Sequence, residues 1–384
     1  MKQTAICLAI ILFSCRSLVT THEDVESAIY YEGASQESSE FNDTLKVMTW
    51  NIRFGAGRIP FFGDSCGDRV LMTETETLGY MDSIIVYINL TQPDVLLLQE
   101  VDISSKRSAY VNQLQYILNH THLNYAAYAS MWNAEIIASD GLGKVDAGNA
   151  VLSRWKITDA ERIKLPLRTD QDPLTQYFYL RRNILKAKIA LPIDNDFYAV
   201  NIHATAFATD DTKQKHIAKY KEVLDDLVDQ GAIFVSGGDL NSIPTGAEPF
   251  DFCLIDKCEH ENWHTISEEE GPHKKGSYFN NFQEVDNYPS EKNLLKPFYD
   301  DLDNYFPAVN FENRNSEDHF THCTYNTAEV YRTWDRKLDY LFTNKEDWSS
   351  TGKTHQGPIN LSDSGPFIYS DHAPVSATLT FTFP

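Results

Sequence analysis

Apolar and β-branched residues recur in short runs from Leu45 onward, and each run ends in polar residues. Such runs, bounded by turn-forming residues, are typical of β-strands. They predict strands at 45–52, 94–99, 150–153, 183–189, 197–202, 233–236, 338–343 and 374–383. Apolar positions with helical spacing predict helices at about 74–89, 108–119 and 212–229. The order of these elements indicates one mixed α and β layered domain over residues 44–384.

Two segments depart from this pattern. Residues 16–43 are polar and acidic, so they predict a flexible tether that buries too little apolar surface to become ordered. Residues 242–336 are rich in Asn, acidic and aromatic residues but have weak periodicity. A long irregular stretch within a compact domain indicates a functional excursion or partial disorder.

The N-terminus resembles an export signal. Lys2 precedes an apolar run from Ala5 to Phe13, and polar residues follow from Arg16. The run is too short to span a bilayer comfortably. Residues 12–15 also resemble a lipobox, which predicts a lipid-carrying Cys15 and membrane attachment; ordinary cleavage and full secretion is the alternative. Both interpretations place the mature protein outside the cytosol.

Composition narrows the possible partners. The chain has 55 acidic and 33 basic residues and a net charge of −22, which repels polyanions and argues against passive nucleic-acid binding. An enzyme acting on phosphate esters stays possible, because a bound divalent cation reverses the local field. Four cysteines outside the leader allow two disulfides or buried thiols: Cys66, Cys253, Cys258 and Cys323.

Polar residues that could take part in catalysis or metal binding stand at the ends of the predicted strands or just before them. They are Asn51, Glu100, His203, Asp239, Asn241, Asp339, Asp371 and His372. A single carboxylate at a strand end is usually a cap or turn residue, so the order of the set carries the argument. Asp239 and Asn241, one residue apart after a buried strand, point to the same side.

This ordered set resembles the endonuclease/exonuclease/phosphatase superfamily, above all in GGDLN at 237–241 and SDHAPV at 370–375. The resemblance covers Leu45 to the C-terminus outside the excursion. It implies an α+β fold: a four-layer αββα sandwich of two packed mixed sheets flanked by helices, with the site at one edge.

The resemblance also implies roles for the residues. Asn51, Glu100 and Asp371 are expected to bind Mg²⁺ or Mn²⁺, which prefer oxygen ligands. Asp239 and Asn241 would orient the attacking water and the phosphate. His203 and His372 would share acid and base duties, and Asp339 would fix the tautomer of His372.

Four further features are weaker. Arg182, or its neighbour Arg181, is a candidate phosphate contact, and Asn149 is expected to support the site. The spacing of His319, His322 and Cys323 suggests a metal site, but a surface loop is favoured. Residues 59–62 suggest an exposed membrane hairpin, but a buried turn is favoured.

The sequence therefore predicts an exported, metal-dependent phosphoesterase, most simply a phosphodiesterase of nuclease type. Its partner would be a phosphate-ester substrate, namely a nucleic acid, a phospholipid or a small phosphodiester, with no obligate protein partner evident. A sphingomyelinase-like or other phospholipid hydrolase and a phosphomonoesterase are alternatives within the same chemistry. A catalytically silent surface binding protein is the alternative outside it.

Overall fold

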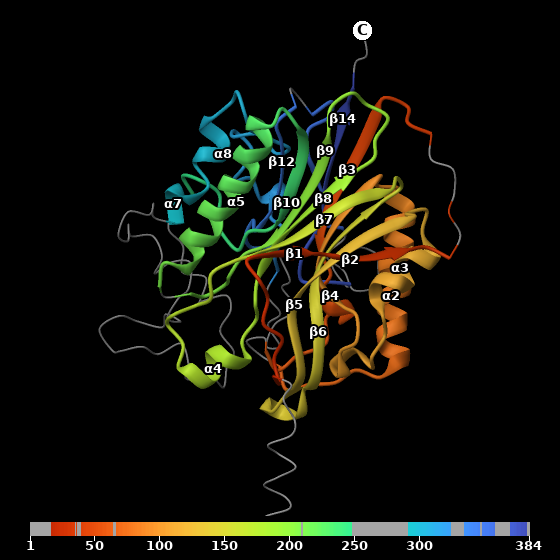
Figure 1. Cartoon of the computed structure of the whole chain (residues 1–384), viewed down its shortest axis with the longest axis vertical. Helices are drawn as coiled ribbons and strands as arrows, with labels where there is room; N and C mark the ends of the chain where they lie inside the picture. Colours follow the sequence, from red (N-terminus) through yellow and green to blue (C-terminus); the bar gives the residue numbers. More distant parts are fainter. Residues whose placement is uncertain are drawn as a thin grey trace, which may run out of the picture.

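Two seven-stranded mixed sheets form the centre of the molecule, which we describe from a computed structural model (Figure 1). The structure describes residues 17–34, 36, 40–63, 67–208, 210–247, 291–323, 334–345, 348–357 and 369–381. The excursion's aromatic residues at 263, 278, 279, 282 and 288 lie outside the described residues, as do Cys66, Cys253 and Cys258.

The first sheet has the order β13-β14-β3-β4-β6-β5-β2. Its strands are β13 (Lys353–Thr354), β14 (Val375–Thr380), β3 (Thr44–Asn51), β4 (Val95–Asp102), β6 (Gly143–Ser153), β5 (Tyr125–Ile137) and β2 (Ile29–Glu32). β3 and β4 are parallel, so their carboxyl ends, which carry Asn51 and Glu100, lie together.

The second sheet has the order β1-β7-β8-β9-β10-β12-β11. Its strands are β1 (Val25–Ser27), β7 (Ile157–Lys164), β8 (Asn183–Ile189), β9 (Phe197–His203), β10 (Ile233–Asp239), β12 (Asp339–Thr343) and β11 (Phe306–Pro307). β9 and β10 are parallel, and β12 runs antiparallel beside β10, which places Asp339 opposite Asp239.

Helices cover the outer face of each sheet, which confirms the expected four-layer sandwich (Figure 1). α2 (Glu74–Thr91) and α3 (Gln113–His120) pack on the first sheet, and α5 (Thr212–Asp229), α7 (Glu291–Leu294) and α8 (Pro297–Asp300) pack on the second. The short helix α4 (Pro173–Phe178) has no buried residue. Among the described residues, no helix is long and apolar enough to cross a membrane.

The apolar core lies between the sheets, with further cores under the helices. Leu45, Val47, Leu97 and Val235 belong to the central cluster. α7 and α8, within the expected excursion, contribute Leu294 and Phe298 to the cluster under α5. This part of the excursion is therefore integral to the domain.

The expected tether is wrong for the described part of residues 16–43. β1 pairs with β7 at one sheet edge and β2 pairs with β5 at the other, so the segment joins the two sheets. Most of its side chains stay exposed, while Val19 and Ala28 are buried. Backbone hydrogen bonds to edge strands hold it, which the composition of its side chains did not reveal.

Candidate active site

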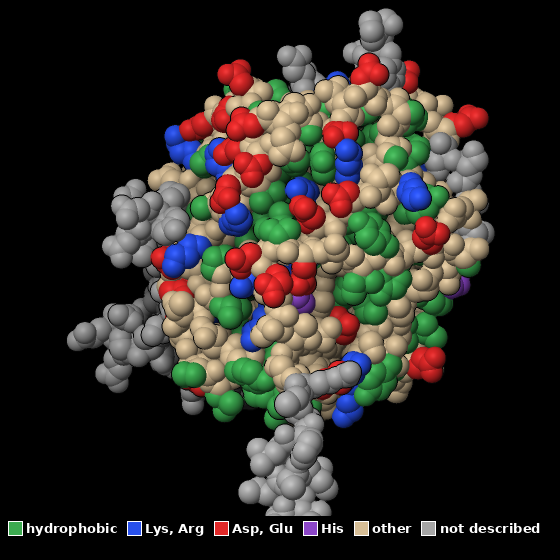
Figure 2. All heavy atoms as spheres, viewed as in Figure 1, with side chains coloured by type: hydrophobic (Ala, Val, Ile, Leu, Met, Phe, Trp, Pro, Cys, Tyr) green, Lys and Arg blue, Asp and Glu red, His purple; other side chains and the backbone are tan. Residues whose placement is uncertain are grey.

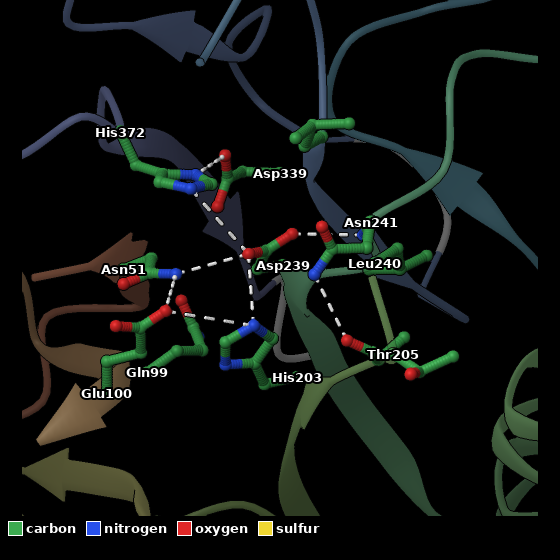
Figure 3. A network of polar contacts seen from close by, with 12 residues as sticks. Asn51, Gln99, Glu100, His203, Thr205, Asp239, Leu240, Asn241, Asp339 and His372 are labelled. Atoms are coloured by element: carbon green, nitrogen blue, oxygen red, sulfur yellow. Dashed lines mark hydrogen bonds and ion pairs between the residues drawn. The ribbon is translucent and has the colours of Figure 1, made fainter. Parts of the chain in front are cut away.

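Polar side chains from both sheets converge where β3, β4, β9 and β10 end, an end of the sandwich that we call the catalytic edge (Figure 3). The strand register pairs Asp239 with His203 on one side and with Asp339 on the other. Across the gap between the sheets, Asn51 Nδ2 donates to Asp239 Oδ2 at 3.1 Å. Side chains distant in sequence thus form one contact network.

Two glycines allow β10 to sit close to its neighbours at this edge. A Cβ on Gly238 would lie 1.9 Å from the Ile202 carbonyl oxygen, and one on Gly237 would lie 2.1 Å from that of Tyr340. Gly238 also has a φ of +135°, which side-chain-bearing residues rarely adopt. The GG pair is therefore required for placing Asp239 between β9 and β12.

Asp239 is the centre of the network. Its Oδ2 lies 3.3 Å from His203 Nε2 and 3.7 Å from His372 Nε2, and Oδ1 accepts from the Asn241 backbone N–H at 2.9 Å. Burial raises the pKa of Asp239, but the charges of His372 and His203 outweigh it and hold that pKa well below its usual range. The carboxylate is therefore ionised and lies between two imidazoles.

His372 is fixed by its neighbours. Its Nδ1 lies 2.7 Å from Asp339 Oδ2, and its backbone carbonyl oxygen accepts from Trp50 Nε1 at 2.9 Å. Its two acidic neighbours, Asp339 and Asp239, are buried. Burial disfavours the charged imidazole, but Asp339 and Asp239 together raise the pKa of His372 to about 10. The expected pairing of Asp339 with His372 is thus present in the structure.

Glu100 is more accessible than the carboxylates of Asp239, Asp339 and Asp371, with its side chain 27% exposed. Its Oε1 accepts from Asn51 Nδ2 at 3.1 Å and lies 4.0 Å from His203 Nε2. Its φ of +58° falls at the irregularity between Leu98 and Val101 in the β4–β6 pairing. Such backbone strain in a non-glycine residue is maintained only where the surroundings fix it, often at functional sites.

A divalent cation fits this collection of donors. The carboxylates of Glu100, Asp239, Asp339 and Asp371 gather around two histidines, and oxygen-rich sites of this kind suit Mg²⁺ or Mn²⁺. Donor atoms of Asp239, Asp339 and His372 lie within 4.8 Å of one another. The side-chain oxygen Oδ1 of Asn51 accepts from the Arg53 backbone N–H at 3.0 Å. The side-chain nitrogen Nδ2 of Asn51, rather than the expected ligand oxygen, therefore faces the carboxylates.

Asp371 lies beside these groups with different partners. Its carboxylate is 3.5 Å from Arg53 Nε. Burial raises its pKa, but His372 and Arg53 reverse the shift and lower that pKa to about 2. Asp371 is ionised and accessible enough to bind a cation, with its side chain 21% exposed.

The expected surface loop at 319–323 is wrong, because this segment forms part of the catalytic edge. The His322 ring lies 5.0 Å from that of His372, and donor atoms of His322, Asp371 and His372 lie within 4.8 Å of one another. Thr321 and Cys323 are buried, and Thr321 accepts from the Asp339 backbone N–H. Bridges to residues 336 and 372 create this arrangement, and no local sequence pattern signals such pairing.

The remaining candidate residues differ in whether they contact the residues around Asp239 or support the packing of the strands. Arg182 is 7% exposed and donates to the His203 carbonyl oxygen at 3.3 Å, whereas Arg181 donates to Tyr179 beside α4. Asn149 donates to the Asn183 carbonyl oxygen, so it supports strand packing. Asn241 Nδ2 donates to the Ala204 carbonyl oxygen at 3.0 Å.

Sequence reasoning missed several supporting residues. The buried Gln99 side chain in one sheet donates to Asn201 Oδ1 in the other sheet at 2.7 Å. Ser370 Oγ donates to the backbone carbonyl oxygen of Asn51 at 2.6 Å. Both stand next to predicted site residues in the sequence, which was the only available signal. The candidate hairpin at 59–62 is a buried turn, as favoured, because Ile59 and Phe61 are buried.

The fold and this site define a metal-dependent hydrolase of phosphate esters. The sequence model of the Endonuclease/Exonuclease/phosphatase family matches residues 48–372, and the chain belongs to this family. No curated protein sequence matches it.

Solved structures share the fold at low sequence identity, each with a TM-score of 0.50. The endonuclease/exonuclease/phosphatase from Beutenbergia cavernae DSM 12333 is 18% identical, and the match covers 88% of this chain and 72% of that one. A family protein from Leptotrichia buccalis C-1013-b is 15% identical over 87% and 98%. The human Nocturnin catalytic domain, solved with a bound sulfate anion, is 14% identical over 92% and 97%.

Proposed function

We propose that the chain is an exported phosphodiesterase that uses Mg²⁺ or Mn²⁺. The observation that carries the proposal is the placement of ionised Asp239 between His203 and His372, with Asp339 behind His372. This arrangement supports hydrolysis by water, because one carboxylate can hold the nucleophile within reach of two proton-transfer groups.

In this mechanism Glu100 and Asp371 would hold the cation, which when bound supplies charge neutralisation to the phosphate and the leaving oxygen. Asp239 orients the water, and the backbone N–H of Asn241 donates to Asp239 Oδ1. His203 and His372 share the proton transfers at their Nε2 atoms, both of which face Asp239 Oδ2. Arg182 supports the backbone at His203 and adds positive charge on that side.

The test is hydrolysis of bis-(p-nitrophenyl) phosphate with Mg²⁺, Mn²⁺ or chelator. His372→Ala should lower turnover by roughly 100-fold or more, since a placed acid or base contributes at least that much. His120→Ala, at an exposed helix position, is the matched control and should leave turnover unchanged. Activity that survives chelator, or a folded His372→Ala protein with full activity, would contradict the mechanism.

A phospholipid hydrolase acting at a membrane is the second candidate, and exposed apolar side chains at the catalytic edge favour it. Leu18, Ile136, Leu174 and Tyr177 are each more than a third exposed. Leu18 links them, because its N–H donates to the Tyr177 hydroxyl and its carbonyl accepts from Glu135, next to Ile136. The loop that carries α4 contacts the loop after His203 through Arg168 and Phe207.

The position of this apolar cluster agrees with an export signal or lipid anchor at residues 1–15. Leu18 lies three residues after Cys15, so an acyl chain on Cys15 would hold the catalytic edge close to the lipid surface. Parallel assays with DNA, RNA and sphingomyelin would choose between the two candidates.

A further inference from the structure

A pocket with cationic lining residues lies beside the N-terminal segment, away from Asp239. The cavity has a volume of about 160 Å³ and is lined by Thr21, His22, Arg162, Lys164, Leu165, Leu167 and Arg181. Three of these residues are cationic, and none is a carboxylate. The setting makes this composition unusual, since the net charge is −22 and acidic side chains spread over the face seen in Figure 2.

Arg162 is the central group of this pocket. It is 2% exposed, and backbone carbonyl oxygens of Ser130 and Arg181 accept from its Nε and Nη2 at 2.9 and 2.7 Å. Its Nη1 has no hydrogen-bond partner among the described residues. A buried guanidinium without a full set of partners is costly, so Arg162 has an unsatisfied donor beside this cavity.

The nearest carboxylate does not supply that acceptor. Glu26 Oε1 lies 3.8 Å from Arg162 Nε and is already engaged by His22 Nδ1 at 2.6 Å. Burial, with a contribution from Arg181, lowers the pKa of Arg162 to about 10 despite the opposing effect of Glu26. The positive charge of Arg162 is thus only partly balanced within the protein.

The other two cations add to this excess. Arg181 donates to the backbone carbonyl oxygens of Tyr177 and Tyr179, which leave its charge uncompensated by those contacts. Lys164 stands at the more exposed side and pairs with Asp24 at 3.0 Å, but both side chains are well exposed, so water screens the pair. Leu165 and Leu167 are the apolar residues that line the cavity.

We propose that this pocket binds a phosphate group. A guanidinium matches the geometry of a tetrahedral oxyanion, and charge-assisted hydrogen bonds would satisfy Arg162. The site is separate from the catalytic centre: β7 and β9 flank β8, so two strand spacings, about 10 Å, separate the end of β7 from His203. It does not rest on the proposed function, because binding requires no hydrolysis.

The experiment is calorimetric titration of the full chain with inorganic phosphate at constant ionic strength, in chelator. Lys164→Glu should weaken binding about five-fold or more by reversing the charge at the exposed side. Lys219→Glu, which reverses an exposed charge on α5, should bind as the unaltered protein does. Arg162→Met should abolish binding, provided that its thermal unfolding shows a folded protein.

His203→Gln alters the catalytic centre but not the pocket, so it distinguishes binding at the two places. It also distinguishes free phosphate from the second phosphate of a substrate. Inorganic phosphate should bind this variant unchanged. If both His203→Gln and Lys164→Glu weaken the binding of fructose 1,6-bisphosphate, one ligand spans both sites and the pocket accepts a substrate's second phosphate. If only Lys164→Glu weakens it, the pocket binds a separate phosphate. Full-strength binding by Lys164→Glu, or loss of inorganic phosphate binding in His203→Gln, would overturn the proposal.

Discussion

Asp339 shows how a single buried residue sets the chemistry of its neighbour. It is fully buried, its backbone N–H donates to Thr321 Oγ1, and its Oδ2 meets His372 Nδ1 at 2.7 Å. This contact orients the imidazole so that Nε2 faces Asp239. In the proposed mechanism, Asp339 would therefore act through His372, as a positioning residue.

Asp339→Asn should lower kcat by about 100-fold or more while changing KM little, because the amide cannot stabilise a charged His372. The pH profile of kcat should also change, since the pKa of His372 falls without this carboxylate. The profile and the thermal unfolding of the variant provide the check. An unchanged profile in a folded variant would show that Asp339 does not control His372.

At the scale of elements, β10 requires a glycine at Gly238, whereas α2 has room for a side chain at Gly79. Gly238→Ala should strongly lower the unfolding temperature, because its Cβ would clash with β9 at a φ of +135°. Gly79→Ala, on α2, meets no atom within 4 Å and should raise stability by roughly 0.5–1 kcal/mol. Thermal unfolding of the two variants compares them directly, and equal shifts would contradict the role assigned to Gly238.

The start of α2 predicts a dependence of stability on pH. Thr73 and Glu76 form a capping box, and hydrogen bonds from Arg69 and then Thr73 lower the pKa of Glu76 from 4.5 to about 2. The stabilisation is complete above pH 4.5 and is lost as the pH falls towards 2, because only the folded state holds Glu76 ionised there.

Glu76→Gln should therefore cost stability at pH 6 but very little near pH 2. Urea unfolding midpoints at both pH values test this expectation. Glu74→Gln, in the same helical turn, is the control. A loss of equal size at both pH values would show that the carboxylate charge is not the cause.

At the scale of the whole molecule, the N-terminal segment joins the two sheets and brings the chain to the catalytic edge. β1 and β2 extend opposite sheets, and Leu18 meets α4 at Tyr177. The proposed lipid-facing cluster thus combines side chains from three parts of the chain: Leu18, Ile136, and Leu174 with Tyr177.

Leu174→Ser should weaken sedimentation of the protein with phosphatidylcholine vesicles by about five-fold or more, since it removes an apolar side chain from the lipid contact. Leu90→Ser is the matched control, because Leu90 on α2 is 75% exposed and Leu174 is 69% exposed. Equal vesicle binding by the two variants would remove the support for a lipid substrate.

The sequence by itself determined the strands whose patterning is local and the residues that end them. β8 and α5 match the predicted ranges, and Asn51, Glu100, His203, Asp239, Asp339 and His372 converge as their order implied. The parallel strands β3 and β4, and β9 and β10, place their carboxyl ends at one edge, and the antiparallel strands β12 and β14 begin at that same edge.

Only the tertiary structure decided what depends on contacts between distant segments. β5 is rich in alanine and lacks clear alternation, and β1 and β2 bury few side chains; all three depend on pairing with other strands. His322 reaches His372 through bridges, and the Arg162 pocket exists because the N-terminal segment lies against β7. Backbone pairing between remote segments leaves little trace in local patterning, because its stabilising hydrogen bonds are the same for almost every residue type.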